Sequence, residues 1–272
     1  MKRARRGRPL RPGSSARAQD GTDIAGSAGQ RWAVRFAVSG DVRFLSHHET
    51  VHALELAAAR AAVPLRYTQG FNPHPILSLA APRPVGVSSR DELLVMSLDS
   101  LVQPADLLAA LAAQVPEGVR FLRAEPLESR GYPRPLCIGY ELALGEAELG
   151  GVRDRLAVLA AEPTWPVERW TPPKGRRRGE AATTRIFDVK PMIADLRLEG
   201  SLLRWSAVPA GDAWPRCGDV LKLVGLDERV KLADVVRTAV NYATDDRAEP
   251  SQHNEGSPPQ PPQGRDDRAE TE

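Results

Sequence analysis

The sequence predicts an α+β fold made of two small ferredoxin-like (βαββαβ) units in tandem, flanked by disordered tails. Three observations predict it: an alternating apolar strand after residue 31, a helix start signal at Ser46, and a strand–helix order that returns in the second half. We expect the first unit over 31–128 and the second over 136–243.

The first unit begins with a strand over 32–38, in which every second residue is a bulky apolar one. A short extension of the sheet is expected over 42–45. Ser46 and Glu49 have the spacing of a capping box, which predicts a helix over 47–62. The remaining expected elements are strand pieces over 65–68 and 76–80, a strand over 91–98, a helix over 104–114 and a strand over 119–124.

A similar order of elements returns in the second unit, although Gly150 and Gly151 weaken its first helix. The expected strands are 138–144, 167–170, 185–196, 202–208 and 233–240, and the expected helices are 146–161 and 218–224. Two halves of this order each predict an antiparallel sheet with both helices on one face.

The two ends of the chain carry opposite charge. Residues 1–30 hold seven basic and two acidic side chains, whereas residues 244–272 hold eight acidic and three basic ones. Both segments are rich in Gly, Pro and Ser and poor in bulky apolar residues, so we expect them to be disordered. The basic tail is either a nucleic-acid contact or a solvated segment that aids solubility.

Composition excludes several classes of protein. No apolar run approaches the ~20 residues of a membrane helix, and no apolar segment follows the basic N-terminus as in a secretory signal. Cys137 and Cys217 alone cannot form a disulfide framework, a four-cysteine zinc site or an iron–sulfur cluster. We therefore expect a cytoplasmic protein without membrane association, bound metal or cofactor.

Four of the five histidines lie between residues 47 and 74. His48 and His52 share a helix face, which suits either a metal pair or, as we favour, a solvated polar stripe. His47 stands at the helix N-terminus, where the helix dipole disfavours the imidazolium. It is a candidate acid or base beside an anion, or a first-turn residue that only packs.

The loop over 69–75 is the most unusual segment, because it places an aromatic ring, an amide and an imidazole between prolines. Such a loop suits a stacked RNA base near a phosphate, and a purely structural loop is the alternative. Its candidate binding residues are Gln69, Gly70, Phe71, Asn72 and His74.

A basic segment separates the two strands expected around residue 175. Its four cations form either a phosphate-binding patch or a solvated hairpin tip. They are Lys174, Arg176, Arg177 and Arg178.

Three stretches of the first unit resemble the radical SAM-linked protein family, a domain of unknown function. They are GDVRFLSH at 40–47, YTQGFNPHP at 67–75 and PVGVSS at 84–89, followed by Glu92. That family is found beside, or fused to, radical SAM proteins with a cobalamin-binding-like region. The resemblance therefore implies a radical SAM protein as the partner of this chain.

The chain itself is not expected to be a radical SAM enzyme, because such an enzyme holds its cluster with three closely spaced cysteines. We expect a non-catalytic accessory protein that binds or presents RNA, with Arg43, Ser46 and His47 completing the substrate site. Two alternatives stay open. One is a metal-independent RNA-processing enzyme that uses His47 or His74, and the other is a protein-interaction module.

Overall fold

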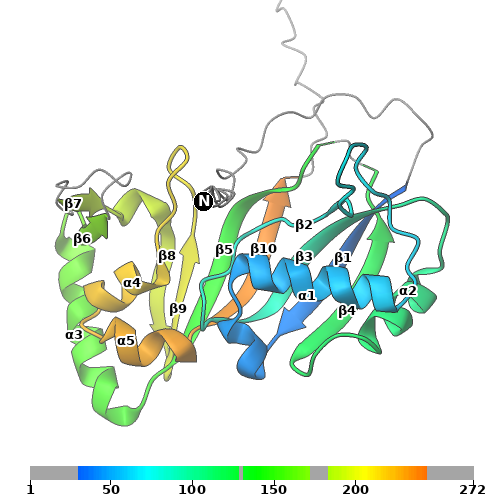
Figure 1. Ribbon diagram of the computed structural model, residues 1–272. Helices are drawn as coiled ribbons and strands as arrows, with labels where there is room; N and C mark the ends of the chain where they lie inside the picture. The colour runs from blue at the N-terminus through cyan, green and yellow to red at the C-terminus, as the bar shows by residue number, and fades with distance from the viewer. Residues whose placement is uncertain (1–29, 129–130, 172–182, 244–272) are drawn as a thin grey trace, which may run out of the picture.

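Eight strands form one mixed sheet that runs through both halves of the chain (Figure 1). The computed structural model describes residues 30–128, 131–171 and 183–243. A separate two-stranded hairpin lies beside one end of this sheet. Mainly antiparallel strands and interspersed helices confirm the α+β class. Within the described ranges, no helix is long and apolar enough to cross a membrane.

The first half has the element order β, α, β, β, α, β. Its members are β1 (Gln30–Val38), α1 (His47–Arg60), β2 (Leu77–Leu79), β3 (Ser88–Leu98), α2 (Pro104–Ala112) and β4 (Val119–Pro126). The strands lie in the order β4-β1-β3-β2, and every neighbouring pair is antiparallel. A βαββαβ chain produces this order when each helix carries the chain back across the same face.

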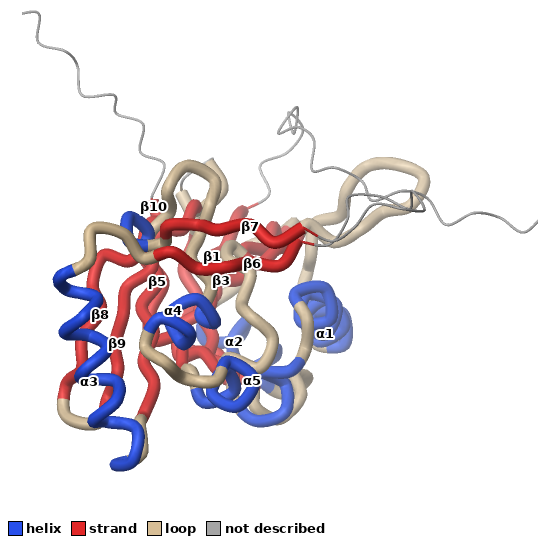
Figure 2. The backbone as a smooth tube through the Cα atoms, turned by 90° about the vertical axis from the view of Figure 1, so that its left-hand side faces the viewer, coloured by secondary structure: helices blue, strands red, loops and turns tan. Residues whose placement is uncertain are grey.

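The second half repeats this strand order. Its members are β5 (Arg134–Ala143), α3 (Glu146–Ala161), β8 (Ile193–Glu199), β9 (Leu202–Ala207), α4 (Cys217–Leu223), α5 (Glu228–Lys231) and β10 (Val236–Ala243). The strands lie in the order β10-β5-β9-β8, again with antiparallel neighbours. A hairpin of β6 (Pro166–Thr171) and β7 (Thr183–Asp188) is inserted between α3 and β8 (Figure 2).

Helices cover one face of the sheet in each half. In the first half, Leu54 of α1 and Leu107 of α2 share a core with Phe36 of β1. In the second, Val152 of α3 and Leu221 of α4 share a core with strands β5 and β9. Full burial of such a side chain contributes roughly 1.5–3 kcal/mol, so the two cores hold both helix pairs in place.

The halves are joined by a parallel contact between β3 and β10, which the sequence did not predict. Val236 pairs with Ser88, and Arg237 pairs with Ser89. This contact makes the sheet continuous from β4 to β8.

The segment before α1 differs from the prediction. Residues 42–45 were expected to extend the sheet, but a 3-10 helix occupies Gly40–Phe44. Gly40 has φ +61, a left-handed conformation that turns the chain away from the strand direction. The predicted capping box of Ser46 and Glu49 is confirmed at the start of α1.

The strand expected over 185–196 is also wrong, because it is two strands in different sheets. The Asp188 carboxylate accepts hydrogen bonds from the backbone N–H of Trp165 at 2.8 Å and of Lys190 at 3.1 Å. These bonds turn the chain into a short 3-10 helix, Lys190–Met192, which separates β7 from β8. The closing strand starts at Val236 rather than at residue 233, because the 3-10 helix Leu232–Asp234 precedes it.

Candidate functional site

The loop over 68–75 is a hydrogen-bonded projection between α1 and β2. The Thr68 backbone N–H donates to the His74 carbonyl at 2.8 Å, and the His74 N–H donates to Thr68 Oγ1 at 3.0 Å. Tyr67 and Pro75 form an isolated β-bridge below them. The base of the loop is therefore held by backbone contacts.

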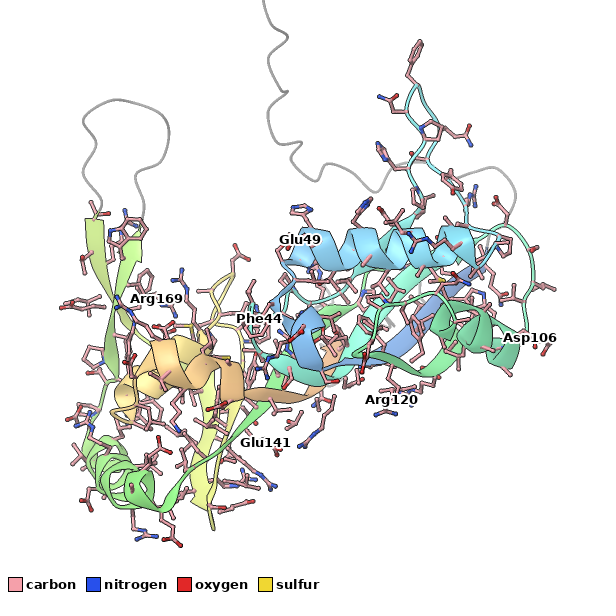
Figure 3. All side chains as sticks on the ribbon, turned by 60° about the horizontal axis from the view of Figure 1, so that its bottom comes forward. Phe44, Glu49, Asp106, Arg120, Glu141 and Arg169 are labelled. Carbon is pink, nitrogen blue, oxygen red and sulfur yellow. The ribbon has the colours of Figure 1, made fainter. Side chains whose placement is uncertain are left out.

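The predicted binding residues of this loop lie at its exposed end. Phe71 is fully exposed, and Gln69, Asn72 and His74 are exposed as well. Gly70 has φ +142, a conformation that side chains rarely allow. Figure 3 shows the loop standing away from the body of the protein. An aromatic ring in this position is free to stack on a ligand.

The second group of predicted residues lies at the start of α1. The Ser46 hydroxyl accepts from the Glu49 N–H at 3.3 Å, and Glu49 accepts from the Ser46 N–H at 2.8 Å. The Arg43 guanidinium lies 4.9 Å from the centre of the Phe44 ring. This segment is therefore fixed by local contacts before any ligand binds.

His47 is partly enclosed in the first turn of α1. Burial, together with the nearby His48, lowers the pKa of His47 below its ordinary value of 6.5. The two rings meet edge to face, with their centroids 5.9 Å apart. Burial and the His48 ring, rather than the helix dipole considered from the sequence, are the causes of this shift toward the neutral imidazole.

The structure does not bring His47 and His74 together into one catalytic group. His47 opens α1, near Glu49 in Figure 3, whereas the loop rises beside the C-terminal half of that helix. Helix α1 has 14 residues and is therefore about 20 Å long. His52 lies 3.6 Å from Glu55, on the exposed face expected for a polar stripe. Within the described ranges, no group of three His, Cys, Asp or Glu could hold a metal ion.

The basic residues Lys174, Arg176, Arg177 and Arg178 lie outside the described residues, in the connection between β6 and β7. The strands that lead into this connection are described. Trp170 pairs with Thr184 near the end of the hairpin, and its side chain is 63% exposed. Sequence reasoning missed Trp170 as a functional candidate, although it lies only four residues before Lys174.

Arg169 has a different role from its basic neighbours. Its guanidinium is buried and bonds both carboxylate oxygens of Asp219, at 3.2 and 2.5 Å. It also donates to the Trp214 carbonyl at 3.2 Å. Arg169 therefore anchors the hairpin to α4, and its charge is neutralised within the protein.

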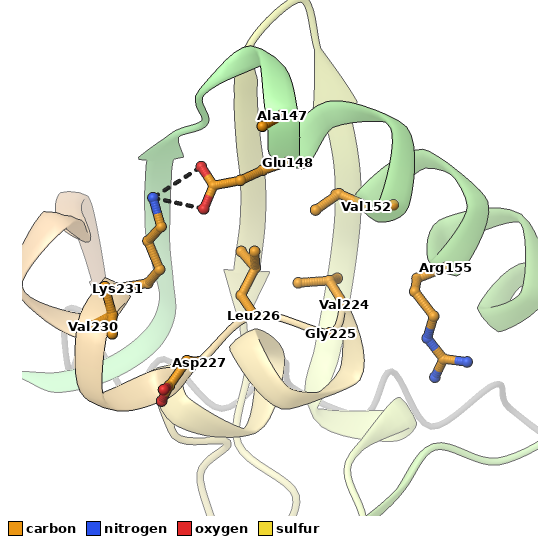
Figure 4. Close-up of a pocket in the computed structure, with 11 residues that line it drawn as sticks. Ala147, Glu148, Val152, Arg155, Val224, Gly225, Leu226, Asp227, Val230 and Lys231 are labelled. Atoms are coloured by element: carbon orange, nitrogen blue, oxygen red, sulfur yellow. Dashed lines mark hydrogen bonds and ion pairs between the residues drawn. The ribbon is translucent and has the colours of Figure 1, made fainter.

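A cavity of about 470 Å³ lies between α3 and the segment that joins α4 to α5 (Figure 4). Lys231 Nζ lies 2.7 Å from the Glu148 carboxylate across one end, and this contact lowers the pKa of Glu148. Arg155, which also lines the cavity, donates to the Leu223 carbonyl at 3.1 Å. These charged groups hold α3 against its neighbours, and we assign this cavity a structural role.

Comparison with protein families finds one match that covers most of the chain. Residues 31–214, from β1 to Trp214, match the family described as an uncharacterized protein conserved in bacteria (DUF2344). No curated protein matches the chain. The expected membership of a domain family of unknown function is confirmed, and the chain belongs to the DUF2344 family.

Proposed function

We propose that the protein is a non-catalytic accessory protein that binds a single-stranded RNA segment and presents it to a radical SAM enzyme. The observation that carries the proposal is the fully exposed ring of Phe71 on a loop whose base is fixed by hydrogen bonds. Exposed aromatic rings on firm supports are the stacking platforms of single-strand binding proteins.

A second exposed ring supports the same proposal. Trp170 stands on β6, and the connection that follows it carries four basic residues within 174–178. Proteins that bind single strands combine stacking rings with cations along the phosphate backbone. Phe71 and Trp170 would therefore each stack on a base, while the basic segment contacts phosphates.

The accessory role rests on the cysteines and on the family resemblance. Cys137 and Cys217 are the two cysteines of the chain, and they lie far apart in sequence. Cys217 is buried, and burial raises the pKa of its thiol to about 12. A protonated, enclosed thiol is a poor cluster ligand, so radical chemistry is assigned to the partner. The resemblance to radical SAM-linked proteins supports that choice of partner.

Fluorescence anisotropy with a labelled single-stranded RNA of mixed sequence tests the RNA-binding step. Phe71→Ala is expected to weaken binding by about 1–3 kcal/mol, because one stacked base is lost. The matched control is Leu101→Ala, which removes an 84% exposed apolar side chain from another loop and should not change affinity. Equal affinities of Phe71→Ala and the unaltered protein would contradict the assignment.

Two further experiments, an RNA cleavage assay and a protein capture assay, separate the two alternatives. RNA cleavage without added metal, abolished by His47→Gln or His74→Gln, would favour an RNA-processing enzyme. Capture of a radical SAM protein by a chain that binds no RNA would favour a protein-interaction module.

A further inference from the structure

A cavity of about 430 Å³ lies where the two halves meet. Three separate stretches of the chain form it: the segment before β3, strand β5, and the segment from Trp214 to β10. Pro82, Ile138, Trp214 and Leu232 give it mainly apolar walls. Small-molecule sites have this size and lie preferentially at such junctions.

Two of the side chains that line the cavity, Arg237 and Tyr140, are held in place by contacts within the protein. Arg237 donates to the Pro82 carbonyl at 2.6 Å and to both carboxylate oxygens of Glu92 at 3.1 Å. The Tyr140 ring stacks on Trp205, with centroids 5.3 Å apart and planes 17° from parallel. Lining side chains that are already fixed reduce the entropy that binding must remove.

Two further charged side chains, Arg216 and Glu228, also line the cavity. Arg216 is exposed and supplies N–H donors, and Glu228 supplies carboxylate acceptors. A Cβ at Gly218 would overlap the Glu228 carboxylate, so glycine is what allows this carboxylate to lie against α4. Lys222 lies 3.1 Å from one Glu228 oxygen and helps to orient the carboxylate.

On two sides, hydrogen bonds link the cavity to segments that carry candidate binding residues. On one side, Arg169 bonds the Trp214 carbonyl and is followed directly by Trp170. On the other, Arg83 donates to the carbonyls of Arg43 at 2.7 Å and Pro84 at 3.3 Å. Figure 3 shows Phe44 in the first half of the chain and Arg169 in the second.

We propose that this cavity binds a single unstacked nucleobase. Apolar walls suit the two faces of a planar ring, while Arg216 offers donors and Glu228 offers acceptors to its edge. The edge of a base carries donors and acceptors in one plane, which a purely apolar ligand lacks. The proposal rests on the proposed function for the choice of ligand, and it adds a site that distinguishes one base from another.

Titration of the full chain with each of the four nucleosides, followed by NMR, tests the proposal. The Trp214 indole resonance, assigned from Trp214→Phe, is expected to shift saturably with at least one nucleoside. Glu228→Gln is expected to lower the affinity for the preferred nucleoside about tenfold, because a charged acceptor is lost. The matched control is Glu146→Gln, which alters an exposed carboxylate on α3 and should change nothing.

The fold of each variant is checked in the same spectra. The indole N–H of Trp165 donates to the Leu159 carbonyl at 2.9 Å inside the second core, so its resonance should stay in place. Displacement of the nucleoside by a short single strand would identify an RNA base as the occupant. Tighter binding of a nucleoside monophosphate without such displacement would identify a free nucleotide.

Either of these results supports a nucleobase site. The proposal is overturned if no nucleoside shifts the Trp214 resonance, or if Glu228→Gln and Arg216→Ala both leave binding unchanged. Phe71→Ala distinguishes this failure from failure of RNA binding. It should weaken binding of the RNA strand and leave binding of the nucleosides unchanged.

Discussion

Arg237 on β10 donates to both carboxylate oxygens of Glu92 on β3, at 3.1 Å each, across the junction of the two halves. The side chains are 1% and 3% exposed, respectively. Burial disfavours the charge of Arg237, but the carboxylate of Glu92 raises the pKa of the guanidinium. Arg237 therefore stays charged, and its bonds to Glu92 tie together residues that are 145 positions apart in sequence.

Removing one partner of this pair should be strongly destabilising. Arg237→Met leaves the Glu92 carboxylate buried without its cation and should cost about 3–5 kcal/mol of unfolding free energy. Chemical denaturation measures the loss. The double variant Arg237→Met, Glu92→Leu should recover part of the lost unfolding free energy. A loss in the double variant equal to the sum of the losses in the two single variants would contradict this account.

The capping box at the start of α1 should contribute measurably to stability. Ser46→Ala removes the side-chain acceptor for the Glu49 N–H and should cost about 1 kcal/mol. Ser201→Ala, in the exposed turn after β8, is the matched control and should change stability by less than about 0.5 kcal/mol. Equal melting curves for both variants would show that the cap is unimportant.

The same cap predicts a dependence on pH. Hydrogen bonds from Ser46 lower the pKa of Glu49 below its ordinary value of 4.5. A carboxyl group whose pKa is lower in the folded state stabilises that state at pH values above its pKa in the unfolded state. This stabilisation is lost as the pH falls through the pKa of the folded state. Glu49→Gln should therefore be less stable than the unaltered protein at pH 7, and the difference should disappear as the pH falls through the lowered pKa of Glu49. A difference that grows in acid would contradict the cap.

His47 should titrate below its ordinary value of 6.5, because burial and His48 both disfavour its charged form. Since the folded state binds this proton less readily than the unfolded state does, protonation of His47 destabilises the fold as the pH falls below 6.5, and above that pH the neutral imidazole carries no such cost. NMR titration of the imidazole measures the midpoint. His48→Gln should raise the midpoint of His47, and an unchanged midpoint would remove His48 as a cause.

Local patterns in the sequence predicted much of this fold. Ser46 and Glu49 fix the start of α1, and the alternation of residues 32–38 fixes the buried face of β1, because both signals depend on near neighbours. The β3–β10 contact could not be predicted in this way. It depends on the pairing of Arg237 with Ser89 and on the burial of Glu92, which only the complete fold brings together.

The candidate sites also divide into one that local sequence patterns predict and one that only the fold assembles. The exposed loop around Phe71 was predictable, since its glycine and prolines mark a projection within a few residues. The cavity at the junction was not, because Pro82, Tyr140 and Arg216 come from distant stretches of the chain. The exposure of Trp170 is not predictable from the sequence, because aromatic residues in strands pack against neighbours that only the fold defines.

The most direct test of the central claim is the salt dependence of RNA affinity, measured on a chain that lacks residues 1–29. Removing these residues eliminates the seven cations of the N-terminal segment, and β1 remains whole from Gln30 onward. Each phosphate contact on a single strand contributes ~0.7 to the slope of log affinity against log salt. Replacing Lys174, Arg176, Arg177 and Arg178 with alanine should therefore reduce that slope by about 3. Phe71→Ala should lower affinity at every salt concentration and leave the slope unchanged. No measurable binding by the shortened chain, or a slope that the four alanines do not alter, would contradict the proposed RNA interface.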